Sequence, residues 1–302
     1  MAVRIGQNRS PMSDSAPAIE RIGVVGCGLM GSGIAEVSAR AGLDVMVREV
    51  NEAAAEAGRA RLVKSLDRGL TSGKLTEQER DDAIARLNFT TDVADLADRQ
   101  LVVEAVVEDE AMKVDIFQQL DRVVTADGAI LASNTSSIPI MKLGTATQRP
   151  EQVIGIHFFN PVPVLRLVEL VTSLMTSDET TERSESFATG VLDKRVIKSQ
   201  DRAGFVVNAL LIPYLLSAIR MMESGFASAE DIDTGMIEGC SHPMGPLQLT
   251  DLIGLDTTLA VAESLYTEFK EPLYAPPPLL SRMVDAGLLG RKAGRGFYDY
   301  HR

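Results

Sequence analysis

The first two-thirds of the chain, from Ile19 to about Arg202, alternates short runs of β-branched residues with longer segments of helical spacing. This alternation is typical of βα units around a parallel sheet. The predicted strands are Arg21–Val25, Asp44–Glu49, Leu101–Ala105, Ile130–Ser133, Ile154–Phe158 and Leu167–Val171. We therefore predict an α/β domain over residues 19–202, preceded by a flexible tail over residues 1–18.

Strand patterns stop after about Ala203, and the remaining segments have helical spacing broken by glycine and proline. One long apolar run, Phe205–Met222, has nearly the length of a membrane span, but it contains Asn208, Pro213 and Arg220. We interpret it as a buried helix and expect no contact with a membrane. The sequence thus predicts an all-helical second domain over residues 203–302.

The net charge and the small number of cysteines exclude several classes of partner and site. A net charge of -12 over 302 residues argues against nucleic acid as a partner, because nucleic-acid-binding proteins gather positive charge on one face. Only Cys27 and Cys240 are present, and their separation gives neither a disulfide framework nor metal-ligand spacing. The N-terminal residues lack the apolar core of a signal peptide, and Met12 is an alternative start site. We expect a cytoplasmic protein without a metal site.

A glycine-rich loop follows the first predicted strand. Gly26, Gly28 and Gly31 form a G-x-G-x-x-G pattern, with Leu29 and Met30 between the last two glycines, and a helical segment begins there. In such a loop the glycines allow a tight turn, close approach of a pyrophosphate and close packing of helix on strand. The phosphates then bind at the positive end of the helix. Strand, loop and helix in this order predict a Rossmann-type dinucleotide-binding domain.

The end of the second predicted strand distinguishes between the two nicotinamide cofactors. Glu49 lies eighteen residues after Gly31, where a carboxylate binds the ribose hydroxyls of NAD and repels a 2'-phosphate. Arg48 precedes it and is the residue type that NADP enzymes use. Because neighbouring side chains of a strand point to opposite faces, only one of the two can dominate the ribose site. We favour Glu49 and therefore NAD.

Polar residues at the ends of later strands supply candidate catalytic groups. Asn134–Ser137 follows one strand, at the sheet edge where open α/β folds bind ligands. His157 ends another strand, and Glu169 lies inside the apolar run of the next strand, where a buried carboxylate needs a partner. If these two strands are neighbours, the imidazole of His157 is oriented by the carboxylate of Glu169. NAD-dependent alcohol oxidation requires such a base.

Several longer motifs add a resemblance to a known family. They are GCGLMGSGIA from Gly26, EAVVED from Glu104, ASNTSSI from Ala132, HFFNPVPV from His157, GFVVN from Gly204, HPMGPL from His242 and LGRKAGRGFYDY from Leu289. In these stretches the chain resembles the (S)-3-hydroxyacyl-CoA dehydrogenase family, over about Ile19 to Tyr300. The resemblance implies NAD-dependent oxidation of short-chain (S)-3-hydroxyacyl-CoA, and the reverse reduction, in fatty acid or butanoate metabolism.

The resemblance also implies roles for particular residues. His157 corresponds to the catalytic base and Glu169 to the residue that orients it. Ser136 and Asn208 correspond to polar residues that hold the substrate oxygen and the imidazole.

On the cofactor side, Glu108 and Lys113 match positions beside the nicotinamide. The acyl-CoA cleft is expected between the domains, and the helical domain is expected to form a homodimer.

The helical segment after Glu49 is rich in basic residues, and family members use this region for the coenzyme A phosphates. Lys64 and Arg68 share one helix face at i, i+4 spacing and are the candidates in this chain. Basic positions vary within the family, and Ser72 stands where some members carry lysine. A solvated helix face without a ligand remains an equal alternative.

Two other functions remain open. A sister dehydrogenase for 3-hydroxyadipyl-CoA or L-gulonate would have the same fold and catalytic pair. An arginine near the acyl pocket would favour a diacid, and Arg166 is the nearest candidate. A non-catalytic NAD-binding structural protein is the other alternative, but such a protein is expected to lose part of the catalytic set.

Overall fold

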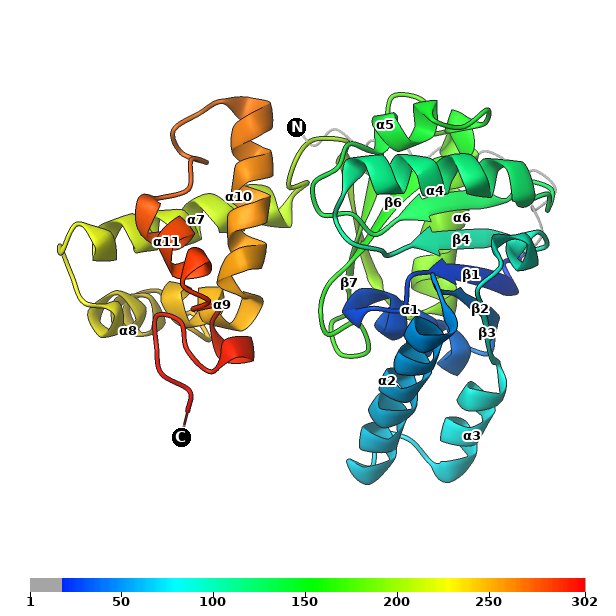
Figure 1. The fold of residues 1–302 in the computed structure, drawn as a ribbon, viewed down its shortest axis with the longest axis horizontal. Coiled ribbons are helices and arrows are strands. Elements are labelled where there is room, and N and C mark those ends of the chain that lie inside the picture. The colour runs from blue at the N-terminus through cyan, green and yellow to red at the C-terminus, as the bar shows by residue number, and fades with distance from the viewer. Residues whose placement is uncertain (1–17, 302) are drawn as a thin grey trace, which may run out of the picture.

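The computed structural model describes residues 18–301, which form two lobes (Figure 1). The larger lobe contains a sheet covered by helices, and the smaller lobe contains only helices. The α/β fold class with a helical C-terminal domain is therefore confirmed. Residues 1–17 of the predicted tail, including the alternative start at Met12, lie outside the described residues.

One sheet of eight strands forms the larger lobe, in the order β3-β2-β1-β4-β5-β6-β7-β8. The strands are β1 (Arg21–Val25), β2 (Asp44–Arg48), β3 (Leu87–Thr90), β4 (Leu101–Glu104), β5 (Ile130–Ser133), β6 (Val153–Phe158), β7 (Leu167–Thr172) and β8 (Arg195–Gln200). The first six run parallel, as predicted. The carboxyl ends of these six strands therefore share one edge of the sheet, which is where the candidate site lies.

The last two strands differ from the prediction of a parallel sheet. β7 pairs antiparallel with β6, and β8 runs parallel to β7. The connection from Phe158 to Leu167 contains no helix. Since a parallel crossover needs a dozen or more residues, the chain can only return antiparallel here.

The sequence prediction missed β3 and β8, which are the two edges of the sheet. β8 has only exposed and half-buried residues and no fully buried position. β3 has four residues, of which only Leu87 is buried. Edge strands lack the continuous apolar run of a strand buried on both faces, so the pattern does not distinguish them from loops.

Helices cover both faces of the sheet. They are α1 (Leu29–Arg40), α2 (Glu52–Thr71), α3 (Glu77–Ala85), α4 (Glu110–Val123), α5 (Ile140–Thr145) and α6 (Asp178–Ser186). Side chains of α1, α2 and α3 pack in one buried cluster with residues 187 and 192 just beyond α6. Those of α4 and α5 pack in a second cluster on the other face. Packing on both faces holds the sheet in place, and with it the strand ends where the candidate site lies.

The helical lobe has its own core. Its helices are α7 (Val207–Glu223), α8 (Ala229–Cys240), α9 (Pro246–Ile253), α10 (Leu255–Phe269) and α11 (Pro278–Asp285). The run Phe205–Met222 is interpreted correctly as a helix: α7 buries Ile212, Leu215, Leu216 and Ile219. Among residues 18–301, no helix is both long and apolar enough to cross a membrane. The start of α7 lies against the sheet, and α10 runs along the side of this lobe that faces the larger lobe (Figure 1).

Candidate active site

A cleft of about 1190 Å³ opens at the carboxyl ends of the parallel strands. Its walls come from the loop between β1 and α1, from the ends of β2, β4 and β5, and from α10 of the helical lobe. The α10 residues are Asp256, Thr257, Ala260, Val261 and Ser264. Both lobes therefore contribute to the cleft, which is large enough for an extended ligand.

The glycine loop has the backbone geometry of a phosphate cradle. Gly26 adopts φ +88°, a conformation that disfavours any side chain, and a Cβ on Gly31 would lie 1.9 Å from the carbonyl oxygen of Gly26. A Cβ on Gly28 would meet nothing within 4 Å, so ligand can approach the backbone there. Leu29 and Met30 begin α1 and also line the cleft. These residues fit a dinucleotide, whose phosphates would lie at the start of α1.

Glu49 and Arg48 both line the cleft. The carboxylate of Glu49 accepts hydrogen bonds from the backbone N–H groups of Cys27 and Val50, which ties the end of β2 to the glycine loop. The Nε atom of Arg48 is buried and has no hydrogen-bond partner among residues 18–301. Burial, reinforced by the charge of Glu49, raises the pKa of the Cys27 thiol to about 12 despite nearby Arg61, so the thiol stays protonated. Cys27 is therefore not a nucleophile at neutral pH.

Three side chains form a hydrogen-bonded chain at the end of β6. In the β6–β7 pair His157 lies directly opposite Glu169, and the Nδ1 atom of His157 lies 2.7 Å from Oε2 of Glu169. The Nε2 atom of His157 lies 3.0 Å from Oγ of Ser136. The strands β6 and β7 are therefore neighbours, which was the condition for the interaction, and their register places His157 next to Glu169.

Burial and a second set of hydrogen bonds hold the Glu169 carboxylate in place. Its side chain is fully buried, and its Oε1 atom accepts the backbone N–H groups of Val206 (3.1 Å) and Val207 (3.0 Å) at the start of α7. Both carboxylate oxygens therefore have donors, as a buried ionised group requires. Glu169 consequently links the imidazole to the first helix of the helical lobe.

This arrangement selects one form of the imidazole. A carboxylate only accepts, so Nδ1 of His157 carries the proton that it donates to Glu169. In the neutral ring Nε2 is then an acceptor, and it lies next to the hydroxyl of Ser136, a residue that lines the cleft. The rings of Phe159 and Phe205 flank His157 at centroid distances of 4.7 and 5.5 Å. The site can thus accept a proton from a hydroxyl at Nε2 and return it in the reverse direction.

An ion network of buried Lys113 and Glu104 with the more exposed Glu108 holds the loop that carries Ser136. Lys113 is almost fully buried, and its Nζ atom lies 3.0 Å from Glu104 and 2.9 Å from Glu108. One oxygen of Glu108 accepts the backbone N–H groups of Ser136 and Ser137. Burial by itself would raise the pKa of Glu108, but Lys113 and the hydrogen bonds from Thr135 and Ser136 hold it below its ordinary value. Glu108 therefore stays ionised and fixes the loop that carries Ser136.

Three of the four predicted substrate-binding residues, Asn208, Lys64 and Arg68, lie outside the hydrogen-bonded chain of Ser136, His157 and Glu169. Asn208 is half-buried in the first turn of α7, next to the N–H groups that Glu169 accepts. Within residues 18–301, however, no hydrogen bond joins it to Ser136 or His157.

Lys64 and Arg68 are exposed on α2, and neither lines the cleft. The structure therefore brings Ser136, His157, Glu169, Glu108 and Lys113 together, and it leaves the two basic residues outside.

Sequence reasoning assigned no role to Glu104, and it named Asn134 only as part of the segment Asn134–Ser137 at the ligand-binding edge of the sheet. Glu104 is fully buried at the end of β4, and it accepts from Ser133 (2.6 Å) as well as from Lys113. The Oδ1 atom of Asn134 accepts the backbone N–H of Phe158 (2.8 Å), which fixes the end of β6 beside His157. The available signal for Glu104 was a carboxylate at the end of the apolar run of β4. A carboxylate within an apolar run was also the signal that identified Glu169, in β7.

Comparisons with known proteins agree with this geometry. Residues 21–202 match the model of the 3-hydroxyacyl-CoA dehydrogenase NAD binding domain, and residues 204–300 match that of the 3-hydroxyacyl-CoA dehydrogenase C-terminal domain. The 3-hydroxybutyryl-CoA dehydrogenase of Mycobacterium tuberculosis is 64% identical over 289 residues, covering 96% of this chain and 100% of the relative. The crystal structure of (S)-3-hydroxybutyryl-CoA dehydrogenase from Ralstonia eutropha is similar with a TM-score of 0.89 at 47% identity. The match covers 94% of this chain and all of that one.

Proposed function

Since the chain belongs to the 3-hydroxyacyl-CoA dehydrogenase family, we propose that it oxidises (S)-3-hydroxybutyryl-CoA and similar short-chain thioesters with NAD, and catalyses the reverse reduction. The observation that carries the proposal is the Ser136–His157–Glu169 chain, because its Ser136 lines the same cleft as the dinucleotide loop. Alcohol oxidation requires at least a base and a hydride acceptor that can both reach the bound alcohol.

Each residue of the site has a separate task in this proposal. Nε2 of His157 takes the proton of the 3-hydroxyl, and Glu169 stabilises the imidazolium that forms. Ser136, which lies 3.0 Å from that Nε2, positions the substrate oxygen, and Asn208 completes the substrate contacts. NAD supplies the hydride acceptor when it is bound at Gly26–Gly31. Glu108 and Lys113 support the nicotinamide side by fixing the Ser136 loop.

The alternatives from the sequence are weaker. Arg166, the candidate for recognising a diacid, pairs with Asp193 (2.9 Å), has 59% of its side chain exposed, and does not line the cleft. This favours a substrate without a second carboxylate over 3-hydroxyadipyl-CoA. A non-catalytic structural protein has no need of a buried imidazole–carboxylate pair, which is costly to maintain without function.

NADH is expected to exceed NADPH by about tenfold or more in catalytic efficiency, because one like-charge contact at a partly buried site costs about 1.4 kcal/mol or more. The contact would be between Glu49 and the 2'-phosphate. The assay compares acetoacetyl-CoA reduction with the two cofactors side by side, and it tests the reaction class at the same time. Equal efficiencies would show that Arg48 governs the ribose site.

We also propose a division of labour between residues 19–202, which bind the cofactor, and residues 203–302, which bind substrate and form a homodimer. Exposed apolar side chains on and just after α7 support the second part: Leu210 is 72% exposed, Phe226 79% and Met221 41%. Burying such a surface against a second copy is favourable. Both cysteines are free, which supports a reducing compartment such as the cytoplasm.

The homodimer is expected to persist at micromolar protein concentration. Multi-angle light scattering after size exclusion measures its mass directly, and a Leu210→Asp/Phe226→Asp variant should shift it toward the monomer because each charge would be buried at the contact. A fully active monomer of the unmodified chain at that concentration would remove the proposal.

A further inference from the structure

Arg48 is the single cation among the described residues that line the cleft, and the proposed reaction gives it no task. Arg48 is half-buried, and its Nε atom is buried without a hydrogen-bond partner among residues 18–301. A buried donor without a partner in the protein is available to a ligand. The same lining contains five carboxylates, which belong to Glu49, Glu108, Glu110, Asp115 and Asp256.

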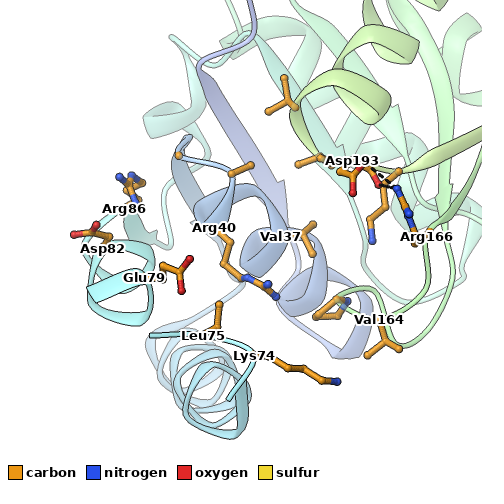
Figure 2. Close-up of a pocket in the computed structure, with 16 residues that line it drawn as sticks. Val37, Arg40, Lys74, Leu75, Glu79, Asp82, Arg86, Val164, Arg166 and Asp193 are labelled. Atoms are coloured by element: carbon orange, nitrogen blue, oxygen red, sulfur yellow. Dashed lines mark hydrogen bonds and ion pairs between the residues drawn. The ribbon is translucent and has the colours of Figure 1, made fainter. Parts of the chain in front are cut away.

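Three cations of a second groove, of about 610 Å³, already have partners. This groove lies outside the cleft, at the end of α1. Figure 2 shows Arg166 beside Asp193, with which it forms an ion pair at 2.9 Å. Arg40 pairs with Glu36 (3.5 Å), and the ammonium of Lys194 donates to two carbonyl oxygens. The chain itself therefore satisfies these three side chains, in contrast to the single cation of the cleft.

Strand register places Arg48 beside the glycine loop. β1 lies between β2 and β4 (Figure 1), and Val25 pairs with Arg48 on one side and with Glu104 on the other. Since neighbouring strands are about 4.8 Å apart, the backbones of Arg48 and Glu104 are separated by about 10 Å across the end of β1. The carbonyl oxygen of Arg48 accepts the N–H of Gly26 (2.9 Å), the first glycine of the loop. The loop therefore leaves the sheet between the end of β2 and the segment after β4.

The alternation along β2 shows on which face of the sheet Arg48 lies. Val45 and Val47 are buried in the cluster that contains α1 and α2 side chains, whereas Met46 packs against the cluster that contains those of α4 and α5. Because side chains alternate along a strand, Arg48 lies on the side of Met46. Val106, just after β4, packs against the same cluster as Met46. Arg48 and Val106 therefore share one face at the end of the sheet.

Glu49 lies on the side of the glycine loop, where its carboxylate accepts the backbone N–H of Cys27. In dinucleotide-binding folds a carboxylate at this position binds the adenosine ribose. The adenine ring is attached to that ribose, so it would lie near the end of β2. Ribose and adenine would then contact different side chains, Glu49 and Arg48.

The side chains at this end of the cleft favour a flat, neutral ring over a phosphate. Val50 (69% exposed) and Val107 (64% exposed) line the cleft together with Arg48 and Val106. A phosphate would meet one arginine beside the carboxylate of Glu49, which repels it. The buried Nε of Arg48 also could not join a two-point contact to phosphate. The planar face of a guanidinium stacks on an aromatic ring without using Nε.

We propose that the guanidinium of Arg48 stacks on the adenine ring of bound NAD, in a pocket that Val106 and Val107 also line. The proposal rests on the dinucleotide site of the proposed function and assigns its adenine pocket. Stacking acts on the same ring in NAD and NADP. Arg48 therefore raises the affinity for both cofactors by the same factor, and Glu49 alone distinguishes them.

The test measures binding alone, by calorimetry with three ligands: ADP-ribose, 2'-phospho-ADP-ribose, and reduced nicotinamide mononucleotide, which lacks the adenosine. Arg48→Ala removes the side chain. Arg48→Lys keeps the charge without the planar face, and Arg48→Phe keeps a planar face without the charge. Arg122→Ala, at an exposed position of α4, is the control for loss of an arginine. Circular dichroism and thermal unfolding establish that each variant is folded.

Arg48→Ala is expected to weaken binding of ADP-ribose and of its 2'-phosphate by the same factor, about fivefold or more, and to leave the mononucleotide unchanged. Arg48→Phe should restore most of this affinity, and Arg48→Lys less of it. A loss confined to the 2'-phosphate, or one that Lys restores and Phe does not, would show that Arg48 binds phosphate and would overturn the proposal.

Affinities equal to those of the control, or a parallel loss for the mononucleotide, would also overturn the assignment of Arg48 to adenine and would leave the proposed function standing. An unmodified chain that binds no ADP-ribose would contradict the dinucleotide site itself, and the proposed function would fail together with this inference.

Discussion

Replacement of Ser136 by Ala is expected to lower turnover about 100-fold, with NADH affinity nearly unchanged. Ser136 Oγ lies 3.0 Å from Nε2 of His157, whereas the glycine loop proposed for the dinucleotide lies between β1 and α1. In the proposed function the hydroxyl orients the substrate oxygen and the imidazole and does not hold the cofactor. Asn208→Ala is expected to act in the same direction.

The measurement is kcat with saturating acetoacetyl-CoA, together with an NADH titration by fluorescence. Ser224→Ala, at the exposed end of α7, is the matched control for loss of a serine hydroxyl. A fall in NADH affinity with unchanged turnover at saturating cofactor would contradict the placement of Ser136. Because Asn208 has no hydrogen bond to the pair in the described structure, a smaller loss for its variant would assign it a lesser role.

The central strands and the glycine loop were predictable because their signals are local. A buried parallel strand is a continuous apolar run, and the G-x-G-x-x-G pattern fixes its own turn through Gly26 and Gly31. The edge strands β3 and β8 gave no such signal. The reversal at β7 was also missed, although the short connection after Phe158 required it.

The catalytic pair was predictable in part, since a carboxylate within the apolar run of β7 needs a partner and His157 ends the preceding strand. Their direct opposition depends on strand register, which the sequence pattern does not specify. The Glu104–Lys113–Glu108 network depends on the order of β4 and β5 and on how α4 packs.

Glu169→Gln is expected to lower turnover by about 100-fold or more, because the substitution keeps the shape but reverses one hydrogen bond. The amide oxygen can still accept from Val206 and Val207, as Oε1 of Glu169 does now. The amide N–H would then donate to Nδ1 of His157. That contact places the ring proton on Nε2, which is the wrong tautomer for accepting a proton from the substrate.

The same substitution changes how the rate depends on pH. Oxidation needs neutral His157, and reduction needs the imidazolium. Glu169 places a negative charge 2.7 Å from the ring and so stabilises the imidazolium. Without that charge, the neutral ring persists to lower pH. The oxidation limb should therefore move to lower pH, and the reduction rate should fall off at lower pH than in the unmodified protein.

The pH profile of both directions, for the unmodified protein and for Glu169→Gln, tests the central claim most directly. Rates are measured with saturating (S)-3-hydroxybutyryl-CoA and NAD, and with acetoacetyl-CoA and NADH, under conditions in which the chemical step limits the rate. Circular dichroism and thermal unfolding establish that the variant is folded. The account predicts opposite limbs around one midpoint in the unmodified protein, and a shift of both limbs to lower pH in the variant. Unchanged limbs in both directions, in a folded variant, would contradict a proton-transfer pair formed by His157 and Glu169.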